Sequence, residues 1–98
     1  MEILFLEFPA GGNRPPHTAH VGVVSSGNLE VLLEGAKGES STVRVRTNVA
    51  GFGEQWKEVI SLFFERHDFA LSIEVNDFGA SPPVVLLRLE QALEEALR

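Results

Sequence analysis

Alternation of apolar and polar residues dominates the first half of the chain and predicts β-strands. Leu29–Glu34 places apolar side chains at positions 29, 31 and 33 and glutamates at 30 and 34, while Thr42–Thr47 places valines at 43 and 45 beside arginines at 44 and 46. Leu71–Asn76 repeats the pattern later in the chain. Because successive side chains of a strand point to opposite faces, this period of two indicates strands with one buried face.

Two further strands are expected near the N-terminus. Glu2–Phe8 is apolar on both faces, which is typical of a strand in the middle of a layer. Ala19–Val24 is followed by Ser25-Ser26-Gly27-Asn28 and then by the alternating strand that begins at Leu29. Small turn-forming residues between two apolar runs predict a β-hairpin, with Gly27 at the position that needs a positive φ.

The second half of the chain changes to the period of helices. Gly53–His67 is expected as an amphipathic helix, because apolar residues recur at i, i+3, i+4, i+7 and i+8. These residues are Trp56, Val59, Ile60, Phe63 and Phe64. Asp77–Ala80 ends the strand that follows, and Ser81 before Pro82 predicts a second helix with serine as N-cap and proline at N1. Its inward residues are Val85, Leu89, Ala92, Leu93 and Ala96.

The resulting order, β-β-β-β-α-β-α, predicts an α+β fold. We expect residues 1–98 to form one domain of two layers, a mostly antiparallel sheet covered on one face by two helices. The stretch from Pro9 to Pro16 is dense in glycine and proline and is expected as an exposed loop.

Acidic composition and the absence of cysteine narrow the function classes. The formal net charge is −6 and the eight Lys and Arg residues are spread along the chain, so no nucleic-acid-binding surface is expected. An acidic surface instead suits docking to a basic partner. Without cysteine there is no disulfide and no thiolate nucleophile, which fits a cytoplasmic protein. We see neither a signal peptide nor an apolar run approaching the roughly 20 residues of a membrane span.

No catalytic or metal site can be assembled from the sequence. Ser26 has His17 and His20 nearby, but a serine nucleophile needs a base that a carboxylate orients, and ordinary surface histidines are the alternative. With His67 added, the histidines still form no familiar metal-ligand spacing. We therefore predict no catalytic residue and no metal ligand. A domain that presents a hydroxyl without an active site of its own suits a carrier protein, which is modified by another enzyme and holds its cargo on a flexible arm.

Four segments carry a resemblance to a known family. They are Phe8–Ala10, Val21–Leu32, Asn76–Pro82 and Arg88–Ala96. In this order they resemble the acyl carrier protein, or delta, subunit of biotin-independent malonate decarboxylase, nearly from end to end. A weaker similarity extends to the acyl carrier subunit of citrate lyase, which shares the serine turn and the Asp-x-Gly-Ala element before a terminal helix.

The resemblance implies a covalent prosthetic group on a serine. Carriers of this family bear 2'-(5''-phosphoribosyl)-3'-dephospho-coenzyme A, joined to a serine hydroxyl through a phosphodiester, and hold acetyl or malonyl as a thioester. The family's serine usually stands in Gly-Ser-Gly-Asp, so the attachment position corresponds to Ser26 in Ser25-Ser26-Gly27-Asn28. Ser25 replaces the family's glycine and is a minor competitor for attachment. Asn28 replaces its aspartate and removes a charge near the site, which is expected to alter recognition by the modifying enzyme without abolishing it.

The resemblance also implies partners and a role. It indicates a non-catalytic subunit of a hetero-oligomer, which works with acyl transferase and decarboxylase subunits to convert malonate to acetate and CO2. A malonyl transferase and a prosthetic-group transferase act on the carrier as well. A citrate lyase-type carrier, a small interaction module with an incidental serine turn and a stand-alone hydrolase are the alternatives. Arg44 and Arg46 neutralise the arm's phosphates only if their strand neighbours the hairpin, and a solvated sheet face is the other interpretation.

Overall fold

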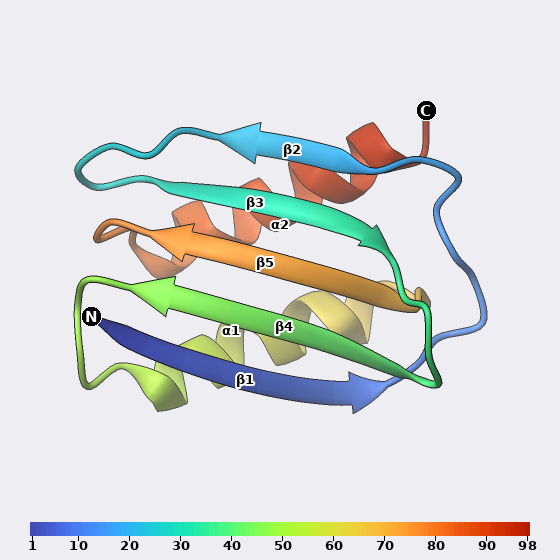
Figure 1. Cartoon of the computed structure of the whole chain (residues 1–98), viewed down its shortest axis with the longest axis horizontal. Coiled ribbons are helices and arrows are strands. Elements are labelled where there is room, and N and C mark those ends of the chain that lie inside the picture. The colour runs from blue at the N-terminus through green and yellow to red at the C-terminus, as the bar shows by residue number, and fades with distance from the viewer.

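A computed structural model describes residues 1–98 and contains five strands and two helices in the predicted order. The strands are β1 (Glu2–Pro9), β2 (Ala19–Gly22), β3 (Leu29–Gly35), β4 (Ser40–Thr47) and β5 (Leu71–Asp77). The helices are α1 (Gly53–Arg66) and α2 (Pro82–Ala96). Both helices lie on one face of a single sheet, so the α+β class and the two-layer arrangement are confirmed (Figure 1).

The sheet runs in the order β1-β4-β5-β3-β2, and β5 is its central strand. Only β4 and β5 are parallel, since α1 connects them and returns the chain to the same end of the sheet; every other pair is antiparallel. The β2–β3 loop, the end of β5, the start of α2 and the β4–α1 connection therefore gather at one end of the molecule, on the left in Figure 1.

The core lies between the sheet and the helices and is made of the side chains that the periodicity predicted. Leu29, Val31 and Leu33 of β3 are buried, as are Val43 and Val45 of β4. The predicted inward residues of both helices are also buried, except Phe64, which is partly exposed and stacks on Phe8 with ring centroids 4.7 Å apart. Burial of these apolar side chains is the main favourable term in the stability of the fold.

The position of the first strand was predicted wrongly. A sequence that is apolar on both faces indicated a central strand, but β1 lies at the edge of the sheet and pairs with β4 alone. Its outward residues Ile3 and Phe5 are 48% and 75% exposed, and the guanidinium of Arg44 lies 5.9 Å from the Phe5 ring centroid. The sheet face opposite the helices is thus open, and β1 keeps apolar side chains on it.

Two boundaries also differ from the prediction. β2 ends at Gly22 rather than Val24, because Gly22 has a φ of +85°, which leaves the extended conformation. α1 ends at Arg66, since His67 has extended backbone. Ser81 does precede α2 in the N-cap position with Pro82 after it, although its hydroxyl makes no capping hydrogen bond.

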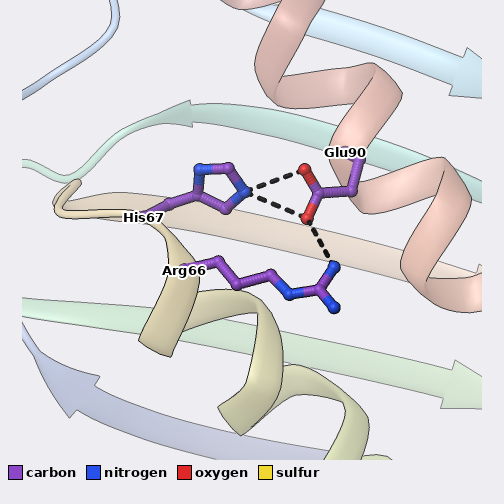
Figure 2. Close-up of polar contacts among 3 residues, drawn as sticks. All are labelled: Arg66, His67 and Glu90. Atoms are coloured by element: carbon purple, nitrogen blue, oxygen red, sulfur yellow. Dashed lines mark hydrogen bonds and ion pairs between the residues drawn. The ribbon is translucent and has the colours of Figure 1, made fainter.

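The end of α1 is joined to α2 by a polar cluster. Nε2 of His67 lies 3.0 and 2.8 Å from the two carboxylate oxygens of Glu90, and Nη1 of Arg66 lies 3.9 Å from Oε1 of the same residue (Figure 2). The cluster ties the two helices together on the covered face of the sheet. Neither helix is long and apolar enough to cross a membrane.

Candidate functional site

The loop between β2 and β3 ends in a tight turn with Ser26 at its apex. The N–H of Asn28 donates to the carbonyl of Ser25 at 3.0 Å, which closes a β-turn over Ser25–Asn28. Gly27, at the third position, has a φ of +75°, the left-handed conformation that a type II turn requires there. The prediction that Gly27 supplies a positive φ is confirmed.

Backbone hydrogen bonds to the loop after β5 hold this turn in place. The N–H of Gly27 donates to the carbonyl of Phe78 at 2.8 Å, and the N–H of Phe78 donates to the carbonyl of Asn28 at 2.9 Å. The side chain of Asn28 also accepts a hydrogen bond from the N–H of Leu29 at 2.7 Å. The turn is therefore a continuation of the β3–β5 pairing, and its direction is set by the centre of the sheet.

Both serines of the turn are exposed, but their backbones differ. Ser25 uses its carbonyl to close the turn and its N–H to reach the carbonyl of Val23 at 3.1 Å, whereas Ser26 makes neither kind of bond. No hydrogen bond involves either hydroxyl. The turn is open at Gly27, where an added Cβ would meet no atom within 4 Å beyond the neighbouring residues. Ser25 is thus tied into the turn by two backbone hydrogen bonds, whereas the backbone of Ser26 is tied to no other residue.

Gly22 controls how the chain enters this loop. A Cβ at this position would lie 2.1 Å from the carbonyl oxygen of Leu29, far inside any allowed contact. Only glycine allows the strand leading into the turn to pass so close to β3.

Arg88 is the basic residue that contacts the turn, and the sequence interpretation missed it. Its Nε donates to Oδ1 of Asn28 at 3.3 Å, and its Nη1 donates to Oε1 of Gln91 at 2.9 Å. These bonds fix a partly buried guanidinium beside Asn28 and leave it further donors. The sequence offered a lone arginine among the leucines of α2, but only the packing of α2 on β2 and β3 shows that it reaches the turn.

Arg44 and Arg46 are not near the turn. β5 lies between their strand and the β2–β3 hairpin, and both arginines lie on the open face of the sheet. Nη1 of Arg44 lies 3.6 Å from Oε1 of Glu74, and Nη2 of Arg46 lies 3.6 Å from the sulfur of Met1. The interpretation as a solvated sheet face is the correct one.

None of the three histidine side chains is hydrogen-bonded to Ser26. Nε2 of His20 lies 2.7 Å from Oε2 of Glu30, whose other oxygen accepts a hydrogen bond from the amide of Asn76 at 2.8 Å. The pKa of Glu30 is held below its ordinary value mainly by the hydrogen bond from Asn76 and, to a smaller extent, by the hydrogen bond with His20. The side chain of His17 has no hydrogen-bond partner, and His67 is bound to Glu90. No group of three histidine, aspartate or glutamate side chains could hold a metal ion.

Comparison with known proteins agrees over nearly the whole chain. Residues 16–96 match the family model described as Malonate decarboxylase delta subunit (MdcD). The malonate decarboxylase acyl carrier protein of Burkholderia cepacia is 50% identical over 97% of this chain and 90% of its own length. That of Pseudomonas aeruginosa strain UCBPP-PA14 is also 50% identical, over 98% of this chain and 97% of its own length.

A solved structure shows the same fold. One chain of a crystal structure of a Pseudomonas malonate decarboxylase hetero-tetramer in complex with malonate superposes with a TM-score of 0.88 and 45% sequence identity. The match covers 98% of this chain and 99% of that chain.

Proposed function

Because the chain belongs to the family of malonate decarboxylase delta subunits, we propose that it is the acyl carrier of a malonate decarboxylase and that Ser26 is its attachment residue. The observation that carries the assignment of Ser26 is its place at the apex of an anchored turn, exposed and next to Gly27, where the turn is open. A transferase can then reach the hydroxyl without unfolding any part of the sheet.

The residues around Ser26 fit a group joined through a phosphodiester. Gly27 leaves room for it, and Arg88 brings a positive charge close to the turn. Arg88 is held through Nε and Nη1, so its remaining N–H groups are free to donate to phosphate oxygens. We assign it the role of holding the phosphate of 2'-(5''-phosphoribosyl)-3'-dephospho-coenzyme A. When attached, this group supplies the thiol that carries acyl groups, which a chain without cysteine cannot supply itself.

The carrier delivers its cargo to the partner enzymes because the cargo is tethered to it. A cargo held on a flexible arm reaches each partner's active site at a high effective concentration, on the order of millimolar for short flexible linkers. The partners in this proposal are the acyl transferase and decarboxylase subunits of the complex, and the malonyl and prosthetic-group transferases that load the carrier. The structural relative comes from a hetero-tetramer, which supports work within an assembly.

The first experiment is an intact-mass measurement on the protein from its native host, followed by fragmentation to locate any adduct. We expect the mass of the phosphoribosyl-dephospho-coenzyme A group on Ser26. Ser26→Ala is expected to lose the adduct, and the matched variant Ser25→Ala to keep it, with both variants as stable to urea as the parent because both side chains are exposed.

Two results would contradict the proposal. An adduct that persists in Ser26→Ala would move the attachment site, with Ser25 the first position to test. A protein that stays unmodified after co-expression with the modifying enzymes would favour a non-covalent interaction module instead. A citrate lyase-type carrier remains the second carrier hypothesis, but the family match and the named relatives favour malonate.

A further inference from the structure

An apolar pocket of about 260 Å³ opens at the same end of the molecule as Ser26. Its walls come from the connection between β4 and α1, the first turns of α1, the loop after β5 and the start of α2. In Figure 1 these segments meet at the left end, behind the sheet.

The pocket and the serine turn lie on either side of one loop. Gly79 and Ala80 line the pocket, and the residue before them, Phe78, is hydrogen-bonded through both its N–H and its carbonyl to the turn. A Cβ on Gly79 would lie 3.9 Å from the backbone nitrogen of Gly27. A group joined to Ser26 therefore begins within a loop's width of the pocket.

The chemistry of the walls favours a flat aromatic ring with a polar edge. Phe52, which is 47% exposed, and Trp56, which is buried, supply aromatic surface. Gln55 also lines the pocket, is exposed and makes no hydrogen bond within the protein, so its amide can both donate and accept. A purine ring offers the matching pair of a donor and an acceptor on one edge.

The polar groups of Thr47 and Asp77 in the pocket, unlike Gln55, are already hydrogen-bonded, and they disfavour an anion. The hydroxyl of Thr47 donates to Oδ2 of Asp77 at 2.8 Å, and the N–H of Ala80 donates to Oδ1 of the same carboxylate at 2.9 Å. The remaining walls are mostly apolar. A buried carboxylate and apolar walls together repel a phosphate or a second carboxylate, but accept a neutral ring.

We propose that this pocket binds the adenine ring of the arm joined to Ser26; the inference rests on the function proposed above. In the arm, the phosphoribosyl unit joins the serine to the adenosine, so the adenine lies near the attached end and the thiol at the far end. Binding of the adenine fixes the base of the arm against the carrier. The length beyond it stays free to reach the partner enzymes.

Free adenine nucleotides bind this pocket weakly, because one stacked ring supplies few contacts. The tether changes this, since it holds the ring at an effective concentration on the order of millimolar. A dissociation constant for the free nucleotide of about a millimolar thus still leaves the pocket occupied in about half of the modified carrier molecules.

The unmodified protein allows a direct test, since Trp56 is its only tryptophan and lines the pocket. We expect 3'-dephospho-coenzyme A to change the Trp56 fluorescence in a saturable way, and 4'-phosphopantetheine, which lacks the adenosine, to leave it unchanged. Phe52→Ala is expected to weaken binding about tenfold by removing a stacking surface. Leu62→Ala is the matched control, because Leu62 is also exposed and lies on α1, the helix that Phe52 precedes, but does not line the pocket.

The role of Gln55 has its own readout. Adenosine and inosine monophosphates differ at the purine edge that the amide would meet, so the parent protein is expected to prefer the adenine form. Gln55→Ala is expected to lose that preference while keeping the stacking contribution of Phe52.

An equal response to phosphopantetheine would overturn the proposal, because the pocket would then take the aliphatic part of the arm. No saturable response to dephospho-coenzyme A, or binding that Phe52→Ala leaves intact, would overturn it as well. These results are distinct from a failure of the proposed function, which is tested separately by the intact mass of the protein and the location of the adduct. If Ser26 carries the adduct but no adenine binding is measured, only the proposal for the pocket is wrong. If adenine binds but the protein never gains an adduct, the proposed function is wrong, because no tethered arm exists.

Discussion

Replacing Gly22 by alanine is expected to destabilise the protein more than the same change in the serine turn itself. Two effects add at Gly22. Alanine in a left-handed conformation costs about 1–2 kcal/mol, of which the lower entropy of the unfolded chain returns roughly 0.4–1 kcal/mol. In addition, the new Cβ would lie 2.1 Å from the carbonyl oxygen of Leu29, so β2 must move away from β3. Forced overpacking of this kind costs about 1–3 kcal/mol, which brings the total to about 1.5–4 kcal/mol.

Gly27→Ala is the matched variant. Its φ of +75° carries the same conformational cost, but a Cβ there meets nothing within 4 Å, so only about 0.5–1 kcal/mol is expected. Gly38→Ala has open space and no positive φ, and serves as a neutral control within about 0.5 kcal/mol.

Urea unfolding followed by the fluorescence of the buried Trp56 measures all three variants. For a domain of this size, the expected loss at Gly22 corresponds to a fall in Tm of about 6 °C or more. Equal losses for Gly22→Ala and Gly27→Ala would refute the reasoning, because the close approach to Leu29 would then cost nothing.

Three further changes test other parts of the structure. Thr47→Val removes the hydroxyl that donates to the buried Asp77 carboxylate at 2.8 Å, so urea unfolding is expected to show a loss of about 2–3 kcal/mol, and an unchanged midpoint would contradict this. The lowered pKa of Glu30, caused first by the Asn76 amide, means that its stabilising effect is present above the ordinary value of 4.5 and is lost as the pH falls through the folded-state value. Glu30→Gln is therefore expected to lose less stability on acidification than the parent, measured by urea midpoints across that range. Phe5→Ala removes a side chain that is 75% exposed, and a change in stability beyond about 0.5 kcal/mol would show that the open face contributes more than its exposure indicates.

The local features of the fold followed from the sequence, because they depend on neighbours along the chain. The helical stripe that begins at Trp56 and the alternation in β3 each report one buried face, and both faces are buried. Sheet order depends instead on pairing between distant segments. β1 was misplaced for this reason: Ile3 and Phe5 are apolar but exposed at the edge, and composition alone does not distinguish an apolar edge strand from a central one.

The residues of the candidate site also fall into two groups, those that depend on neighbours along the chain and those that depend on contacts between distant segments. The turn with Gly27 could be predicted from a short run of turn-forming residues and is confirmed, whereas Ser26 was assigned as the attachment residue from the family resemblance and stays a prediction. Arg88 could not be found, because its contact with Asn28 spans 60 positions and depends on how α2 crosses the hairpin. Arg44 and Arg46 were considered only because two arginines alternate on a strand, and the intervening β5 separates them from the turn.

The central position of β5 sets the order in which the molecule can be completed during synthesis. β3 and β4 follow each other in the chain but do not pair, and the gap between them is filled only when residues 71–77 have been made. The loop that anchors Gly27 and Asn28 comes later still, at Phe78. A nascent or truncated chain that lacks these residues has no anchored turn to present, and a transferase that recognises the turn would leave it unmodified. Under the attachment proposed above for Ser26, modification would therefore be confined to chains that have been completed through Phe78.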